Sequence, residues 1–260
     1  MDRQAFEDYS ARFAQLLSAF DDVVGIVAIG STADRAERDC WSDHDFGVVL
    51  RDGRPDRFLN DASWLPQAAR IIASARHGNM YNVAIYDDGH KVECLVCDEA
   101  AVSSIVVTKF AMLLDRGEVG KRIEEARSST IARQKVAAEQ NWNPVNLAIV
   151  ILTAAQRGAR GEILSAMSLL AAAVDVVLHI LVAATRSPRP ELLDPLDLRR
   201  RLERSRPEVA QQLANILSSP LKAAIDGLLR FVDVAVRPQT ASLDWPGFDK
   251  VIRTLPRKVP

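Results

Sequence analysis

The chain is short of the residues on which several protein classes depend. Three cysteines and four histidines among 260 residues are too few for a disulfide framework or a typical zinc site. Lysine and arginine together number 33, against 34 for aspartate and glutamate. A dedicated nucleic-acid-binding protein usually carries a marked basic excess, so this balance argues against a nucleic-acid partner.

The sequence also shows little sign of targeting to or through a membrane. The first eight residues, MDRQAFED, contain no apolar signal core. Residues 163–184 form a long apolar run that includes Asp175 and His179, and a charge near the middle of a span is costly in lipid. We interpret the run as a helix of a soluble bundle in which these two side chains share a face and pair. Together with the sparse cysteines, this predicts a cytoplasmic protein without a membrane partner.

Two of the cysteines, Cys94 and Cys97, have the C-x-x-C spacing of some metal and redox sites. They lie in an apolar run, 91–97, that predicts a β-strand. Residues three apart on a strand face opposite ways, which disfavours a shared metal or a redox pair. We expect both to be small buried residues.

The chain does contain a compact pattern of small and acidic residues between two apolar runs. Residues 23–29, VVGIVAI, predict a buried strand that ends at Gly30-Ser31. After eleven further residues, Asp43-His44-Asp45 leads into a second apolar run. Because side chains alternate along a strand, Asp43 and Asp45 should point one way and His44 the other.

This pattern is chemically suited to a metal-bound phosphate. Two neighbouring carboxylates repel each other and raise each other's pKa unless a cation lies between them. Hard oxygen ligands suit Mg²⁺, which usually binds one or two carboxylates together with substrate phosphates. A Gly-Ser turn lets the backbone approach a phosphate, and the serine hydroxyl adds a donor.

A third carboxylate occurs in a predicted hairpin. Two β-rich runs, 82–86 and 91–96, flank the Asp88-Gly89 turn, and Glu93 lies inside the second run. A carboxylate in an apolar strand is costly to bury unless it is paired or binds a metal. The alternative places Glu93 on the solvated face of an edge strand, beside Lys91.

In its order of strand, Gly-Ser, spacer and Asp-x-Asp, the sequence resembles the nucleotidyltransferase superfamily of the DNA polymerase β type. The resemblance implies that Gly30 and Ser31 bind the nucleotide phosphates. It also implies that Asp43 and Asp45 are catalytic residues that bind metal and nucleotide. Glu93 would be the third acidic residue, as a metal ligand or as a general base. The implied cofactor is Mg²⁺, with ATP or another nucleoside triphosphate as co-substrate.

The layout of the chain is similar to that of bacterial aminoglycoside and lincosamide nucleotidyltransferases. This similarity implies transfer of a nucleoside monophosphate, AMP from ATP, to a hydroxyl of a small molecule such as an antibiotic, with release of pyrophosphate. Two alternatives stay open. One is a protein-modifying, AMP-transferring enzyme of the toxin–antitoxin type, and the other is a nucleotide-binding protein without catalysis.

The expected fold class is α+β, because the strand signal is confined to the first half of the chain. We predict a small mixed-sheet catalytic domain over residues 1–117 and an all-α helical bundle over residues 118–260, where long Ala- and Leu-rich segments are interrupted by proline and glycine. We further expect helix over most of residues 55–76 and loop from residue 237 onwards.

The predicted bundle holds the candidate acceptor-binding residues. Arg160 and Glu162 lie between two apolar helices, where Arg160 would contact phosphate and Glu162 would contact the acceptor. The alternative is structural, since a glutamate at a helix start interacts favourably with the helix dipole. Trp142 would either stack on a base or cap the bundle, and the lack of neighbouring aromatic residues favours the cap.

Overall fold

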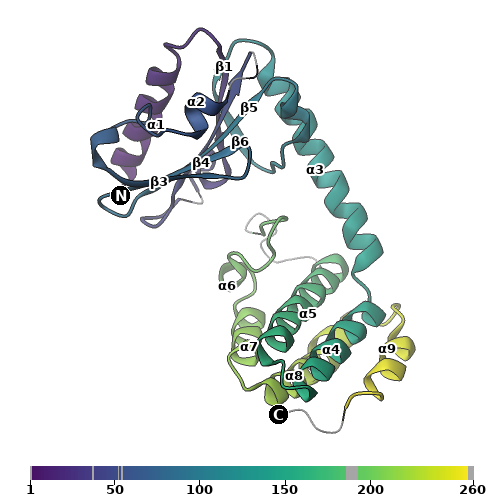
Figure 1. Cartoon of the computed structure of the whole chain (residues 1–260). Coiled ribbons are helices and arrows are strands. Elements are labelled where there is room, and N and C mark those ends of the chain that lie inside the picture. The colour runs from purple at the N-terminus through teal and green to yellow at the C-terminus, as the bar shows by residue number, and fades with distance from the viewer. Residues whose placement is uncertain (1, 37, 52, 54, 186–192, 257–260) are drawn as a thin grey trace. The chain divides into compact units, whose positions relative to one another are not determined.

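Figure 1 shows the computed structural model of the chain, which describes residues 2–36, 38–51, 53, 55–185 and 193–256. The chain divides into two compact units, Met1–Ala132 and Arg133–Pro260. The division falls inside helix α3 (Val119–Asn141). The first unit contains a mixed sheet and the second is helical, which confirms the α+β prediction.

The first unit is built on a six-stranded sheet with the order β3-β4-β5-β2-β1-β6. Its strands are β1 (Val23–Ile29), β2 (His44–Leu50), β3 (Ile71–His77), β4 (Tyr81–Tyr86), β5 (Lys91–Asp98) and β6 (Phe110–Asp115). The central strands β2 and β5 run parallel, and the other neighbouring pairs run antiparallel. The predicted hairpin is therefore confirmed, and β5 is an interior strand.

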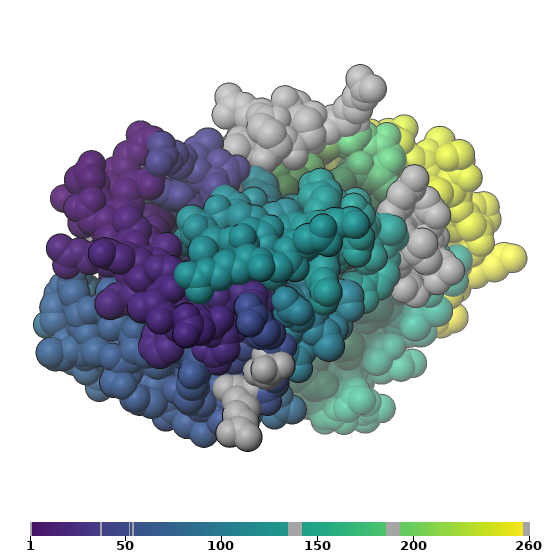
Figure 2. Space-filling view, turned by 90° about the horizontal axis from the view of Figure 1, so that it is seen from above, coloured from purple at the N-terminus to yellow at the C-terminus, as the bar shows by residue number. Residues whose placement is uncertain are grey.

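Helix α1 (Arg3–Leu17) covers one face of this sheet. It starts at Asp2, whose carboxylate accepts a hydrogen bond from the Ala5 amide at 2.8 Å, as an N-cap should. Its apolar stripe includes Phe13, which is buried and stacks on Phe46 of β2 with 3.9 Å between the ring centroids. In Figure 2 the purple N-terminal segment and the blue segments that follow form adjacent parts of one surface, in keeping with this shared core.

The opposite face of the sheet packs against the first turns of α3. Val49 and Leu95 lie in this second core together with Val119 and Ile123 of the helix. Strand alternation separates the cysteines, because Cys94 belongs to the α1 side and Cys97 to the α3 side. Burial raises the pKa of both thiols, that of Cys97 to about 12. The prediction that the two are small buried residues facing opposite ways is confirmed.

The expected helix over residues 55–76 is wrong. Helix α2 spans only Asp56–Leu59, a 3₁₀ turn (η2) spans Ala68–Arg70, and the chain then enters β3. Before that turn Gln67 has a φ of 55°, a left-handed conformation that a helix cannot contain. Pairing of β3 with β4 supplies the hydrogen bonds of this segment, so a tertiary partner decides its state.

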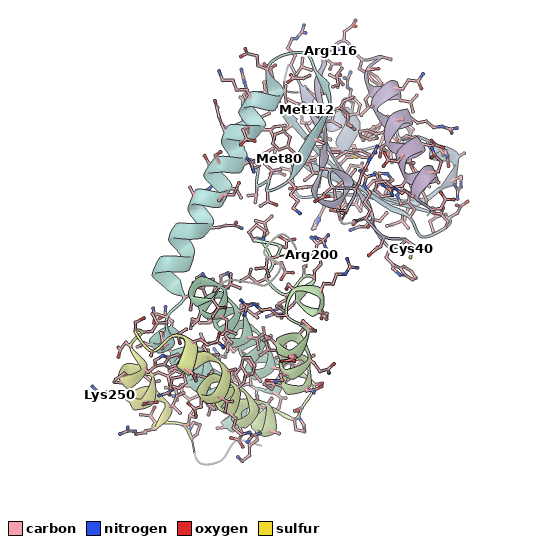
Figure 3. All side chains as sticks on the ribbon, turned by 180° about the vertical axis from the view of Figure 1, so that it is seen from behind. Cys40, Met80, Met112, Arg116, Arg200 and Lys250 are labelled. Carbon is pink, nitrogen blue, oxygen red and sulfur yellow. The ribbon has the colours of Figure 1, made fainter. Side chains whose placement is uncertain are left out.

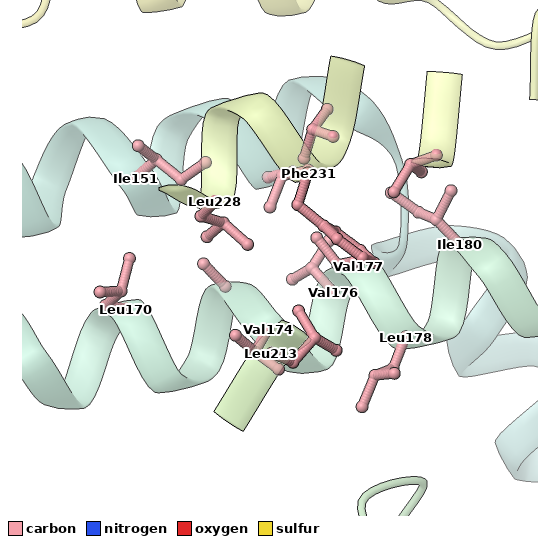
Figure 4. Packing of buried hydrophobic residues seen from close by; sticks show 14 of the residues in the cluster. Ile151, Leu170, Val174, Val176, Val177, Leu178, Ile180, Leu213, Leu228 and Phe231 are labelled. Carbon is pink, nitrogen blue, oxygen red and sulfur yellow. The ribbon is translucent and has the colours of Figure 1, made fainter. Parts of the chain in front are cut away.

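The second unit packs helices around one apolar core. The helices are α4 (Pro144–Ala159), α5 (Ile163–Ala184), α6 (Leu202–Ser205), α7 (Pro207–Leu217), α8 (Leu221–Phe231) and α9 (Trp245–Ile252). A π-helical turn, η5 (Val232–Val236), and a 3₁₀ turn, η6 (Arg237–Gln239), follow α8. Figure 4 shows Leu170 and Val177 of α5 among side chains of the neighbouring helices, including Leu228.

Two details of this unit differ from expectation. Helix α9 occupies part of the predicted C-terminal loop, because Asp244 caps it and Trp245 is buried at its first turn. In α5, the imidazole of His179 bonds the backbone carbonyl of Asp175, while the Asp175 carboxylate pairs with Arg199 at 2.6 Å. The expected side-chain pair is therefore replaced by two separate contacts.

Helix α5 is long and apolar enough to cross a membrane, with a mean hydropathy of 2.2 over its most apolar window. Half of that window is buried inside the structure, against helices such as α4 and α8. Burial of this kind is what a core helix of a bundle shows.

Candidate active site

The predicted carboxylates meet where the two parallel strands begin. Asp45 of β2 is paired in register with Glu93 of β5. Strand alternation places both on the α3 face of the sheet, whereas Phe46 and Cys94 point into the α1 core. The alternative is wrong in placing Glu93 on an edge strand, because β5 has β4 on one side and β2 on the other, but Glu93 does lie beside Lys91 on a partly exposed face, as that alternative expected.

Asp43 and Lys91 stand one step outside this pairing, each two residues before one of the two carboxylates. The ammonium Nζ of Lys91 lies 2.7 Å from Oδ2 of Asp43 and 2.8 Å from Oε1 of Glu93. All three side chains are partly exposed, at 38%, 28% and 37% for Lys91, Asp43 and Glu93. Burial by itself would lower the pKa of Lys91, but the hydrogen bonds and charges of the two carboxylates raise it above its usual value, so this amine stays charged.

A tight turn lies against Asp45. Gly30 opens the 3₁₀ turn η1 (Gly30–Thr32) with a φ of 56°, a conformation that favours glycine. A side chain here would have its Cβ 3.7 Å from Oδ2 of Asp45. Ser31 and Thr32 are buried, and the Thr32 hydroxyl accepts a hydrogen bond from the Asp45 amide at 2.8 Å. The turn is thereby joined to the start of β2.

Arg38 holds this turn from the connecting loop. Its guanidinium donates hydrogen bonds to the backbone carbonyls of Ser31 and Thr32 and pairs with Glu7 of α1. Arg38 also lies over the ring of Phe6, 4.7 Å from its centroid. These contacts fix a loop of irregular backbone to a helix. Neither Arg38 nor Thr32 was predicted from the sequence. The only sequence signal for Thr32 was that a hydroxyl residue directly follows Gly-Ser.

His44 lies behind the site, in the α1 core, as the alternation predicts. Its Nε2 is 3.1 Å from the carbonyl oxygen of Phe6, which can only accept, so Nε2 carries the proton. Its Nδ1 then accepts from Nε2 of His90 at 2.7 Å. Burial, followed by the charge of His90, lowers the pKa of His44 to about 3, so this ring is a neutral structural group that anchors the start of β2.

The hydroxyl of Tyr81 lies near the negative charges of this face. Burial raises the pKa of the Tyr81 hydroxyl, and the nearby charges of Glu93 and Asp45 raise it further.

In the loop that leads to Asp43, Trp41 is 90% exposed and Cys40 is also exposed; Cys40 is labelled in Figure 3. An exposed loop therefore borders the acidic cluster.

The donors fit Mg²⁺ in kind. Asp43, Asp45 and Glu93 offer hard carboxylate oxygens, and two of them already share one cationic group, the Lys91 ammonium. Over the described part of the chain, no three histidine, cysteine, aspartate or glutamate side chains are grouped so that they could hold a metal ion as they stand. A bound metal would therefore require rearrangement of these side chains.

One described cavity lies elsewhere in the first unit. Its volume is about 320 Å³, and its lining includes Tyr9, Arg12, Arg70, Tyr86 and His90. These residues belong to α1 and to the β4–β5 hairpin region, and none of the residues predicted from the sequence lines this cavity. We place the candidate site at Asp43, Asp45 and Glu93 because their carboxylate oxygens are suitable ligands for a metal ion.

The candidate residues of the second unit form a cluster of their own. The Glu162 carboxylate pairs with Arg157 at 2.7 Å and with Arg160 at 2.8 Å. These hydrogen bonds lower the pKa of Glu162. Glu162 is the N-cap residue of α5 without a capping side-chain bond. Local ion pairs are a sufficient structural reason for both residues, and their acceptor role stays a prediction.

Trp142 is stacked on His179, with 3.9 Å between ring centroids and an interplanar angle of 11°. The indole packs against the core of the second unit. This contact favours the structural alternative for Trp142, in which it covers the end of the bundle.

Comparison with known proteins adds little to this geometry. No model of a protein family matches the chain, and no curated protein matches it. Among solved structures, a nucleotidyltransferase-like protein from Exiguobacterium sibiricum 255-15 is similar, with 13% identity and a TM-score of 0.36 over 95% of this chain and 78% of that chain. An aminoglycoside 6-adenyltransferase from Bacillus subtilis is similar with 13% identity and a TM-score of 0.33, over 95% of both chains. Both names agree with the family that the motif resembles, but matches this weak carry no argument, and the case rests on the site.

Proposed function

We propose that the chain is a metal-dependent nucleotidyltransferase that moves a nucleoside monophosphate, AMP from ATP, to a hydroxyl of a small molecule such as an antibiotic. The observation that carries the proposal is the register of Asp45 with Glu93, with Asp43 beside them and the Gly30 turn against Asp45. Carboxylates beside a turn that accepts close backbone approach suit a magnesium–triphosphate site, in which Mg²⁺ usually binds one or two carboxylates together with the phosphates.

In this proposal Asp43 and Asp45 would hold Mg²⁺, which would supply positive charge to neutralise the triphosphate. The amide and hydroxyl of Ser31 bind phosphate oxygens, and Gly30, whose own amide donates to the Lys109 carbonyl at 3.1 Å, lets the backbone approach them closely. The acceptor oxygen forms a bond to the α-phosphorus while the bond to the β-phosphate oxygen breaks, and pyrophosphate leaves. Glu93 either completes the metal site or takes the proton of the acceptor hydroxyl. Positioning and electrostatics supply most of the rate enhancement.

The decisive experiment is incubation of the purified chain with α-labelled nucleotides, Mg²⁺ and a panel of aminoglycosides, lincosamides and proteins, followed by mass spectrometry. We expect label on a small molecule in the wild type and none with Asp45→Asn. Asp226→Asn is the matched control, because Asp226 forms a surface pair with Lys222 in the second unit, and it should keep wild-type transfer.

The same experiment separates the alternatives. Label on a protein would favour the protein-modifying alternative, in which a side chain is the acceptor. Metal-dependent nucleotide binding without label on any acceptor would favour a protein that binds nucleotide without catalysis. Equal transfer by Asp45→Asn and the wild type would refute the site.

A further inference from the structure

The position of the Lys91 ammonium has a consequence for metal binding. It lies within 2.8 Å of both Asp43 and Glu93, between two carboxylates that the proposed function assigns to the metal. Two such carboxylates are held together by whichever cation lies between them, since without one they repel. A divalent cation that binds both of them must displace this ammonium.

The strand pairing brings these three side chains to one level of the sheet. Lys91 and Glu93 are two residues apart on β5 and so share a face. Asp43 precedes the first residue of β2, whose register pairs His44 with Val92, so it is brought to the level of Lys91. A lysine stem is flexible, and its ammonium is a compact charge that can pair with a carboxylate or with a phosphate.

We propose that Lys91 is a built-in counter-ion of the site, which occupies the cation position between Asp43 and Glu93 when no metal is bound and moves to the phosphates of the nucleotide when metal and nucleotide bind together. The inference rests on the proposed function and adds to it an order of events. Metal alone is opposed by Lys91, whereas metal with nucleotide is favoured by it. The site would thus discriminate against free divalent cations and bind the metal–nucleotide complex.

The test is binding of Mn²⁺, alone and with a non-hydrolysable ATP analogue, measured by electron paramagnetic resonance and calorimetry on the full chain. Lys91→Met removes the charge and keeps much of the stem. Free Mn²⁺ should bind roughly 30-fold more tightly than to the wild type, the effect of removing a unit positive charge about 4 Å from a divalent cation in a solvated site. The Mn²⁺–analogue complex should bind more weakly, because the phosphates lose a cationic partner.

Tighter binding of free Mn²⁺ together with weaker binding of the Mn²⁺–analogue complex distinguishes this role from a structural one, because loss of a structural residue would weaken both affinities. Lys91→Arg keeps the charge and should bind free Mn²⁺ as weakly as the wild type does. Lys91→Gln is a second neutral variant in case the methionine impairs folding. Lys222→Met is the matched control, since Lys222 pairs with Asp226 in the second unit, and it should change neither affinity.

The outcomes also separate this inference from the proposed function. Asp45-dependent Mn²⁺ binding that is equal or weaker in Lys91→Met overturns the counter-ion role and leaves the metal site standing. If neither the wild type nor the two neutral variants bind Mn²⁺ in a way that depends on Asp45, both the counter-ion role of Lys91 and the proposed metal site are overturned.

Discussion

Charged side chains are used differently in the two units of the molecule. In the helical unit they pair locally on partly exposed surfaces, as in Glu162 with two arginines and Asp175 with Arg199. The sheet unit also has such pairs, as between Arg70 and Asp87, but in addition it brings Asp45 and Glu93 into register on two strands, with Asp43 just before β2 and Lys91 between Asp43 and Glu93. Carboxylates that strand register brings side by side repel one another unless a cation lies between them, and the described pairs of the helical unit have no such arrangement.

The sharpest test of this contrast replaces a carboxylate by an amide in the sheet unit. Glu93→Gln keeps the shape but removes the charge and the basic oxygen. We expect turnover to fall by ~10²–10⁴-fold, the range for loss of general-base catalysis. Preserved Mn²⁺ affinity would identify Glu93 as the base, and weakened affinity would identify it as a ligand. Wild-type turnover together with wild-type affinity would place Glu93 outside the site.

The next largest effect concerns the core of the helical unit. Leu170 is fully buried in α5, so Leu170→Ala should lower the free energy of unfolding by about 2–5 kcal/mol. Leu164, in the same helix, is 90% exposed, and Leu164→Ala should change stability by less than about 0.5 kcal/mol. Chemical denaturation followed by circular dichroism measures both. If the two variants were equally stable, the assigned core would be wrong.

A smaller effect compares two glycines of the sheet unit. Gly30 has a φ of 56° and Gly89, in the hairpin turn, a φ of 80°. Alanine at either position should cost roughly 1–2 kcal/mol of backbone strain. Only Gly30→Ala should also weaken binding of the ATP analogue, since Gly30 faces Asp45 while nothing lies within 4 Å of a Cβ at Gly89. Equal nucleotide affinities in the two variants would remove the turn from the site.

The smallest expected effect concerns Glu162. Hydrogen bonds from Arg157 and Arg160 lower its pKa below the ordinary 4.5, so its contribution to stability is present above the unfolded pKa and is lost as the pH falls through the folded pKa. Glu162→Gln should therefore melt slightly below the wild type at pH 7 and match it at pH values below the folded pKa. Thermal scans across this range provide the measurement.

A double-mutant cycle with Arg157→Gln isolates the pair, and its two changes should not be additive. A change in the acceptor's KM with Glu162→Gln would instead support the acceptor role predicted from the sequence.

The sequence by itself determined the features that depend on local chemistry. The apolar runs predicted β1 and β2, the Asp88-Gly89 turn predicted the hairpin, and alternation predicted that His44 faces away from Asp43 and Asp45. Each follows from strand geometry or turn chemistry within a few residues. The amphipathic and apolar patterns of the second half likewise predicted most of its helices.

Only the tertiary structure decided which strands are neighbours. The register of β2 with β5 brings Asp45 to Glu93 although 47 residues separate them in the chain, and it adds Asp43 to Glu93 as a second carboxylate partner of Lys91. Residues 71–77 form a strand because β4 pairs with them, against their local pattern. Long-range pairing of this kind is set by the packing of the whole sheet. The few residues around each strand therefore do not predict which strand will be its neighbour.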